Sequence, residues 1–255
     1  MGKKNITFDD IAKYTNFSKT TISRYFNHPD SLTLENQEII AKALKELDYK
    51  ENKVAKVFAN GKTEFVGIIV PNLYMHYYSE MLNQLLNTYG SFGYKFLVFA
   101  GNDSEEKERR YIEELLAYKI EGLIILSNTL SSKVLSDYNI PVVSIEREDR
   151  YICSVNCDNY MGGIQATSLL AKNKCDILIH INSDIPEDVP AFQRVRGFLD
   201  ICREKGIPHE LLIRDFCNDF ESNRTALEQI LDEITIKYKN KRKGIFMPND
   251  TYTNI

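Results

Sequence analysis

The feature that most constrains the fold is the hydrophobic pattern from Glu64 onward. Short apolar runs alternate there with longer amphipathic stretches: FVGIIV, a stretch near 77–90, YKFLVFA, and a stretch near 104–118. Apolar runs of this length, separated by helical patterns, are typical of strands and helices in βαβ units. The sequence therefore predicts an α/β domain with mostly parallel strands.

The same alternation continues towards the end of the chain. Further strands are expected at GLIILS, PVVSI, ICSVN, DILIHI, ELLIRDF and KGIFM, and further helices near 131–138, 158–172, 190–205 and 220–236. Ligands of such sheets bind at the carboxyl ends of the strands. The residues directly after the runs are therefore candidates for a binding site, and they are 71–78, 101–103, 127, 146–147 and 248–250.

The first 62 residues show a different pattern, that of short helices. Thr7 is expected to cap a helix FDDIAKY, whose Asp9 and Asp10 lie where the helix dipole favours carboxylates. Ser18 is expected to cap a second helix, KTTISRYF. Asn16 lies in the turn between them, and asparagine tolerates a left-handed backbone.

A third helix is expected from about Leu34 to Leu47. Its apolar residues at helical spacing, which we expect to form a small core, are Leu34, Ile40, Leu44 and Leu47. The three helices together predict a helix-turn-helix with a supporting helix.

Charge is distributed unevenly along the chain. The net charge is -4, but residues 1–62 hold 11 Lys and Arg against 8 Asp and Glu, or +3, and the remainder is at -7. A charge of +3 is a weak signal, because a solvated helix bundle could carry it. The pattern of residues has to decide whether this segment binds nucleic acid.

Two stretches of the chain, ITFDDIAKYTNFSKTTISRYFN and LKELDYKENKVAKVFANGKT, resemble the DNA-binding headpiece and hinge of the lactose-repressor (LacI-type) family. The chain departs from the family pattern at Asn16 and Phe17 (Gly-Val in the family), Glu51 (Pro) and Phe58 (Leu). The DNA-binding residues that the resemblance implies are Thr7, Ser18, Lys19, Thr20, Thr21, Ser23, Arg24, Asn27, Asn52, Val54, Ala55 and Phe58.

The chemistry of the second helix agrees with the resemblance. Lys19 and Arg24 can donate to guanine, and Thr20 can bond a base or contact a thymine methyl group. The hydroxyls of Ser18, Thr21 and Ser23 suit phosphate contacts or capping. The alternative is that the two cations are ordinary solvated helix charges.

Residues 52–59 place Val54, Val57 and Phe58 on one stripe of a basic helix. The resemblance implies that paired hinge helices insert Phe58 into the minor groove. The alternative is a linker helix that packs its stripe on the next domain. The nearby GKT at 61–63 is not a phosphate-binding loop, because Lys56 occupies the position that requires glycine.

The acidic remainder also resembles this family, whose effector domain has two lobes like periplasmic sugar-binding proteins. The matching stretches are VGIIVPNLYMHYYSEML, VVSIER, AFQRVRGF and MPND. They imply that an effector cleft is lined by Tyr77, Tyr78, Glu146, Arg194 and Asn249. Aromatic faces, a carboxylate, a guanidinium and an amide can together hold a sugar ring and its hydroxyls.

Each of these residues also has a structural alternative. The two tyrosines could be core residues, Arg194 could pair with Asp200 or Glu187, and Glu146 could be solvated. A sugar or sugar phosphate is the leading candidate for the ligand, and a purine is the alternative.

The predicted organisation is a headpiece at 1–50, a hinge helix and linker at 51–62, and an effector-binding and dimerisation domain at 63–255. Family members continue well beyond the position of Ile255. We therefore expect this chain to be a fragment or a truncated product, with an incomplete second lobe.

The sequence also argues against several classes of protein. Five scattered cysteines and four isolated histidines lack the spacing of a metal site, so no metal or cofactor is expected. No apolar run is long enough for a membrane helix, and no signal peptide precedes the first helix, which favours the cytoplasm. No catalytic constellation is evident, so we expect a non-enzyme.

The predicted function is a dimeric, sequence-specific transcriptional regulator, expected to be a repressor. It would bind a near-palindromic operator in double-stranded DNA under control of a small-molecule effector. The alternative is an α/β sugar-binding or sugar-modifying protein whose helical headpiece is an interaction module.

Overall fold

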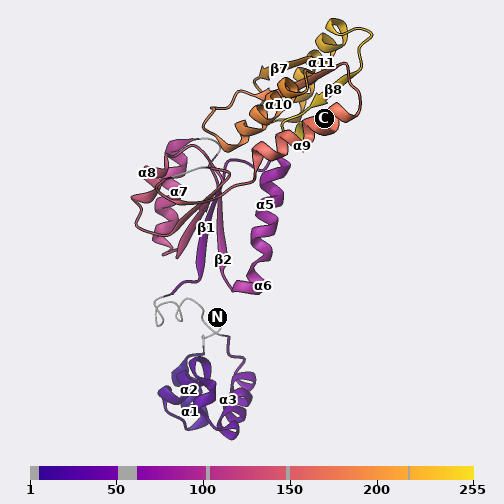
Figure 1. The fold of residues 1–255 in the computed structure, drawn as a ribbon. Coiled ribbons are helices and arrows are strands. Elements are labelled where there is room, and N and C mark those ends of the chain that lie inside the picture. The colour runs from indigo at the N-terminus through magenta and orange to yellow at the C-terminus, as the bar shows by residue number, and fades with distance from the viewer. Residues whose placement is uncertain (1–5, 51–61, 102–103, 148–149, 218) are drawn as a thin grey trace. The chain divides into compact units, whose positions relative to one another are not determined.

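The computed structural model describes residues 6–50, 62–101, 104–147, 150–217 and 219–255 (Figure 1). The chain divides into two compact units, Met1–Lys62 and Thr63–Ile255. Each unit contains its own buried apolar clusters. Among the described residues, we find no helix that is long and apolar enough to cross a membrane.

The first unit contains the helices α1 (Phe8–Thr15), α2 (Lys19–Asn27) and α3 (Leu34–Glu46), with a 3-10 turn η1 (Pro29–Ser31) before α3. Thr7 and Ser18 cap α1 and α2 through their hydroxyls, and Asn16 is left-handed at φ 57°. The buried core consists of Ile11, Ala12, Ile22 and Ile40. The predicted helix-turn-helix and its caps are confirmed.

The prediction that Leu34 belongs to this core is wrong, because its side chain is 78% exposed. Leu34 is the first residue of α3, six residues before Ile40, the first residue of this helix in the core cluster. Leu44 and Leu47 do pack against the core, and Ile40 is fully buried. Helical spacing identified the correct face of α3. It did not show which part of that face contacts α1 and α2.

The second unit begins with a five-stranded parallel sheet in the order β2-β1-β3-β4-β5. Its strands are β1 (Phe65–Val70), β2 (Lys95–Ala100), β3 (Gly122–Ile125), β4 (Val142–Ile145) and β5 (Cys153–Val155). Its helices are α5 (His76–Asn87), α6 (Tyr89–Phe92), α7 (Glu105–Ala117) and α8 (Ser132–Ser136). We call this part the first lobe.

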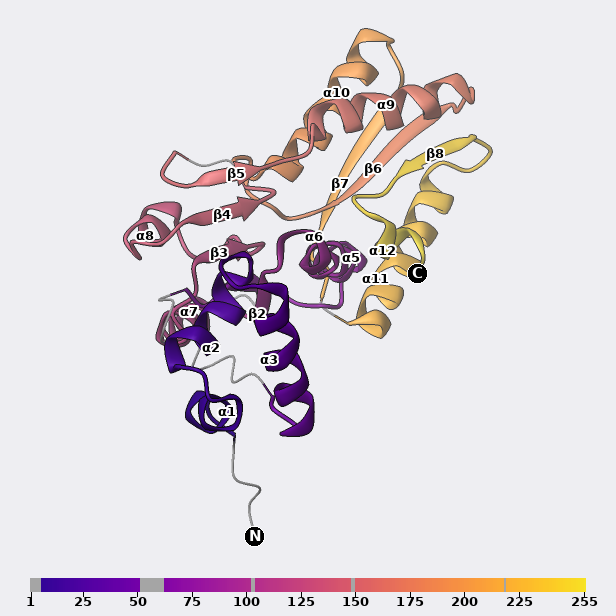
Figure 2. The same ribbon diagram turned by 90° about the horizontal axis from the view of Figure 1, so that it is seen from below.

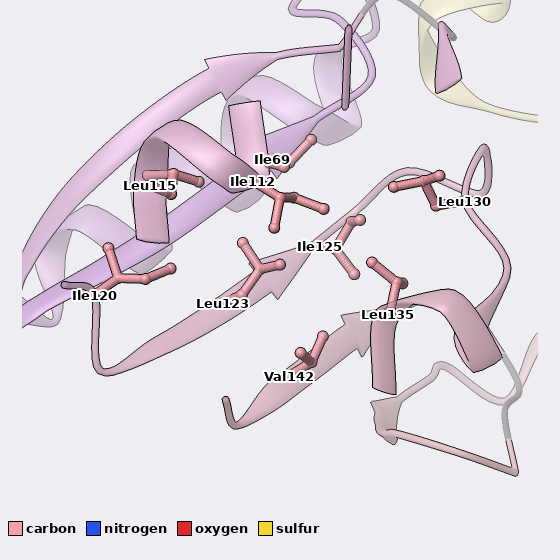
Figure 3. Close-up of a cluster of buried hydrophobic side chains, with 9 residues drawn as sticks. All are labelled: Ile69, Ile112, Leu115, Ile120, Leu123, Ile125, Leu130, Leu135 and Val142. Carbon is pink, nitrogen blue, oxygen red and sulfur yellow. The ribbon is translucent and has the colours of Figure 1, made fainter. Parts of the chain in front are cut away.

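Both faces of the first-lobe sheet are covered, since successive residues of a strand point to opposite faces. Ile69 of β1 packs with Ile112 of α7 and Leu135 of α8 in the cluster of Figure 3. Its neighbours Ile68 and Val70 belong to a second cluster, together with side chains of α5. This double cover explains why the strands are continuous apolar runs.

A second parallel sheet, in the order β7-β6-β8, follows in the chain. Its strands are β6 (Ile177–Ser183), β7 (His209–Arg214) and β8 (Lys243–Phe246). Its helices are α9 (Asn159–Lys172), α10 (Gln193–Glu204), α11 (Phe220–Lys237) and α12 (Asp250–Thr253), and the turn η2 (Pro190–Phe192) precedes α10. We call this part the second lobe.

The helices of the second lobe cover its sheet from two sides (Figure 2). Ile177, Ile179 and Ile181 of β6 pack with α11 and α12, whereas Leu178 packs with Phe198 of α10. The predicted α/β class, with parallel strands separated by helices, is confirmed.

His180 is an unusual residue in this core. Its ring is fully buried and stacks on Phe246 at 4.3 Å, and its Nδ1 lies 2.9 Å from the Phe246 carbonyl oxygen. Because a carbonyl can only accept, Nδ1 carries the proton in the neutral ring. Burial lowers the pKa of His180 to about 4.

The burial of His180 makes the stability of the folded protein depend on pH. The unfolded chain takes up a proton at His180 below its ordinary pKa of 6.5, whereas the folded chain resists protonation down to about pH 4. The contribution of the neutral His180 ring to the free energy of unfolding is therefore complete above pH 6.5. It is lost as the pH falls towards 4, by roughly 3 kcal/mol. Urea unfolding across this window should show a smaller loss in His180→Phe than in the parent. The exposed His209, changed to Gln, is the control and should keep the parent's slope.

Candidate functional site

The first candidate site is the outer face of α2. Lys19, Thr20 and Arg24 are all exposed there. A concave surface of about 440 Å³ on this helix is lined by Thr20, Ser23, Arg24, Asn27 and His28. Exposed cations and hydroxyls beside a concave surface are suited to polyanion contacts and to hydrogen bonds with base edges.

The remaining headpiece candidates hold the local backbone. The Ser18 hydroxyl accepts from the Thr21 amide at 3.1 Å, and the Asn27 side-chain amide donates to the Ser23 carbonyl at 3.1 Å. Thr7 caps α1 in a reciprocal arrangement with Asp10. These contacts fix the start of α1 and the shape of α2, which orients the exposed side chains.

Sequence reasoning missed two residues at this face. His28 lines the concave surface, and the Asp9 carboxylate lies 2.6 Å from the Lys19 ammonium. From the sequence, Asp9 is expected only to favour the dipole of α1. No sequence signal identifies this pair, because it depends on how α1 and α2 cross.

The hinge residues Asn52, Val54, Ala55 and Phe58 lie outside the described residues. Their proposed contact with the minor groove therefore stays a prediction from the sequence.

The second candidate site joins the two lobes of the second unit. We call it the interlobe cluster: Tyr77, Glu146, Cys157, Asn159 and Arg194. Tyr77 comes from α5 and Glu146 follows β4, both in the first lobe, whereas Asn159 begins α9 and Arg194 lies in α10 of the second lobe. Cys157 lies in the connection between β5 and α9.

Glu146 anchors the start of α9. Its carboxylate accepts from the Cys157 amide at 2.5 Å and from the Asn159 side-chain amide at 2.7 Å. The Glu146 backbone is left-handed, at φ 56°.

Asn159 also accepts a hydrogen bond from the guanidinium of Arg194. Its Oδ1 accepts from Arg194 Nε at 2.7 Å, and another nitrogen of Arg194 donates to the Pro248 carbonyl at 2.6 Å. Asn159 is only 6% exposed, so it is a buried bridge between the carboxylate and the guanidinium. The sequence predicts only that Asn159 lies near the start of a helix, and it does not predict that the side chain binds Glu146 and Arg194.

Tyr77 completes the cluster. Its hydroxyl is buried and has no hydrogen-bond partner within the described structure. Burial, with the nearby Glu146 charge, strongly raises the pKa of Tyr77, so the phenol remains protonated. A hydrogen bond to Glu146 likewise raises the pKa of the Cys157 thiol, which makes it a poor nucleophile.

The other two predicted effector residues lie beside this cluster. Tyr78 packs with the apolar residues between β1 and α5, and its ring centroid is 5.3 Å from that of Tyr77. Asn249 caps α12, its side-chain oxygen accepting from the Tyr252 amide at 3.0 Å. Asn249 directly follows Pro248, whose carbonyl holds Arg194.

The structure also distinguishes the alternatives for Arg194. Glu187 lies 3.4 Å from Arg196, and Asp200 lies 3.5 Å from Arg203. Arg194 instead binds Asn159 and Pro248. In the part of the chain that the structure describes, no group of three or more His, Cys, Asp or Glu residues could hold a metal ion.

The fold and these two sites define a class of protein. A helix-turn-helix unit with exposed basic side chains is followed by a two-lobed α/β unit whose lobes are joined by partly buried polar groups. This is the architecture of a DNA-binding headpiece attached to a periplasmic-binding-protein-like domain.

The chain belongs to the LacI family. Residues 7–52 match the family model described as bacterial regulatory proteins, lacI family. Residues 63–234 match the model described as periplasmic binding proteins and sugar binding domain of LacI family. The resemblance noted in the sequence is thereby confirmed.

Sequence identity to individual relatives is low. The chain is 27% identical to the ribose operon repressor of Halalkalibacterium halodurans over 82% of this chain and 63% of that repressor. It is 27% identical to the sucrose operon repressor of Streptococcus mutans over 94% of this chain and 72% of the relative. The aligned region thus spans less than two thirds of the first of these proteins.

Solved structures agree on the fold. A lac repressor dimer bound to operator has a TM-score of 0.75 at 21% identity, covering 90% of this chain and 71% of that one. A LacI-family regulator from Silicibacter pomeroyi has a TM-score of 0.67 at 20% identity, covering 97% and 75%.

Proposed function

We propose that this protein is a sequence-specific DNA-binding transcriptional regulator whose affinity for an operator is controlled by a small molecule. The observation that carries the proposal is the exposed row Lys19, Thr20 and Arg24 on a helix capped by Ser18. In a helix-turn-helix, the N-terminal residues of the second helix contact base edges in the major groove. The repressors among the relatives support the assignment.

The active form that we propose is a dimer on a near-palindromic site. Two headpieces related by a twofold axis recognise two half-sites, and paired hinge helices set their separation. Residues 1–62 carry +3 whereas the remainder carries -7, so the headpiece is the part suited to phosphates. Such a protein works where the DNA is, which in a bacterium is the cytoplasm, and it needs no catalysis.

The proposed effector site is the interlobe cluster. Ligand hydroxyls can bond Glu146 and Arg194, and the unpartnered Tyr77 hydroxyl can donate to the same ligand. A sugar is the leading ligand, in keeping with the names of the ribose and sucrose operon repressors. Because the cluster joins both lobes, a ligand that favours one lobe arrangement changes DNA affinity, and DNA changes ligand affinity by the same factor.

DNA binding can be tested by selecting duplexes from a random pool with the full chain. We expect enrichment of a near-palindromic sequence, with fluorescence anisotropy showing preference over scrambled competitor at moderate salt. If the protein is instead a sugar-binding or sugar-modifying protein with an interaction module, no duplex will be enriched.

The effector site can be tested by thermal shift with ribose, sucrose and fructose 1-phosphate. We expect at least one of them to raise the melting temperature of the parent, and Arg194→Met to lose most of that shift, since a hydrogen bond to a charged group contributes about 1.5–3 kcal/mol. Arg203→Met removes a guanidinium that pairs with Asp200, away from the cluster, and should keep the shift. An equal shift in both variants would place the ligand elsewhere.

A further inference from the structure

The ion pair between α1 and α2 is a second feature of the DNA-binding face. Lys19 is the first residue of α2 and Asp9 the second of α1, and the Asp9 oxygen lies 2.6 Å from Lys19 Nζ. The capping of α1 uses Asp10, not Asp9. At the start of its own helix, Asp9 contributes only the small stabilisation of a carboxylate in the first turn.

The stability of the headpiece does not explain this pair either. Its side chains are 64% and 52% exposed, and ion pairs this exposed contribute little to folding. A carboxylate at a face that approaches phosphates also weakens binding to DNA of any sequence, through like-charge repulsion. The position of Asp9 against Lys19 at this face therefore points to a role in the complex with DNA.

The chemistry of the pair matches one base pair. A G·C pair presents in the major groove the guanine acceptors N7 and O6 beside the amino group of cytosine, a donor. An ammonium and a carboxylate side by side offer the complementary donor and acceptor. Thymine would instead turn its O4 acceptor and methyl group towards the carboxylate, which is unfavourable.

We propose that Lys19 and Asp9 together recognise a single G·C base pair in each half-site, with Lys19 on the guanine and Asp9 on the cytosine amino group. Asp9 is then a specificity-determining residue that also restrains Lys19 from binding phosphates. The inference rests on the proposed DNA-binding function and goes beyond it, because it assigns a base pair and a residue.

Duplex selection with the full-length parent and with Asp9→Asn tests the proposal. The parent should enrich G·C at one position of each half-site. Asn both donates and accepts, so Asp9→Asn should accept thymine there and lose about fivefold or more of the preference for G·C over A·T. Binding to random duplex should strengthen by about twofold to fivefold as the repulsion is removed.

Two controls separate base recognition from a general charge effect. Asp30→Asn removes the same charge from η1 of the same unit and should leave the base preference unchanged. In Lys19→Met, the additional change Asp9→Asn should have a much smaller effect on the G·C preference, since the two residues act on the same base pair.

The outcomes are distinguishable. An enriched parent operator whose base preferences are the same in Asp9→Asn overturns this inference and leaves the proposed function intact. The same conclusion follows if Asp30→Asn changes the preference as much as Asp9→Asn does. A parent that enriches no duplex overturns the proposed function, and the inference with it.

Discussion

Changing Arg24 to alanine is expected to remove most of the preference for operator over scrambled DNA, by about 1–3 kcal/mol per half-site, as for a lost bidentate contact to guanine. Arg24 is exposed and lines the concave surface of α2, one helical turn after Thr20. Because its role is to recognise a base, weak binding to random duplex should persist. Fluorescence anisotropy with both duplexes at several salt concentrations measures the two effects separately.

Lys42→Ala is a suitable control for Arg24→Ala. Lys42 is a highly exposed cation on α3. Its loss should weaken binding to both duplexes equally, or not at all. If Arg24→Ala kept the operator preference of the parent, the assignment of α2 to the major groove would be wrong.

Neighbouring glycines of α9 should respond in opposite directions when changed to alanine. A Cβ on Gly163 would overlap the backbone carbonyl oxygen of Arg194, so Gly163→Ala has to push α9 and α10 apart. We expect a loss of about 1–3 kcal/mol in the free energy of unfolding, as for other overpacked cores. The same movement should displace Arg194 from Asn159 and weaken the interlobe cluster.

Gly162 provides the matched control, because a Cβ there would meet no atom within 4 Å. Gly162→Ala should stabilise the second unit by about 0.5–1 kcal/mol, the usual gain of alanine over glycine in a helix. Urea unfolding of both variants measures the difference. Equal effects at 162 and 163 would contradict the close approach of α9 and α10.

Two adjacent tyrosines show the limit of sequence patterns at the effector site. Tyr77 and Tyr78 both stand at positions where the family motif has phenylalanine, but the structure places Tyr77 in the interlobe cluster and Tyr78 among apolar residues of the first lobe. Successive residues of a helix point in directions about 100° apart. The packing of α5 decides which of the two tyrosines faces the polar groups. The order of residues alone does not show this.

The sequence by itself determined the helices of the headpiece, their caps at Thr7 and Ser18, and the alternation of strands and helices. These features depend on interactions between residues a few positions apart, which local order controls. Only the tertiary structure decided that Asp9 lies against Lys19 and that Asn159 joins Glu146 to Arg194. Those contacts join residues from different elements, and their geometry depends on how the elements pack, which no local pattern records.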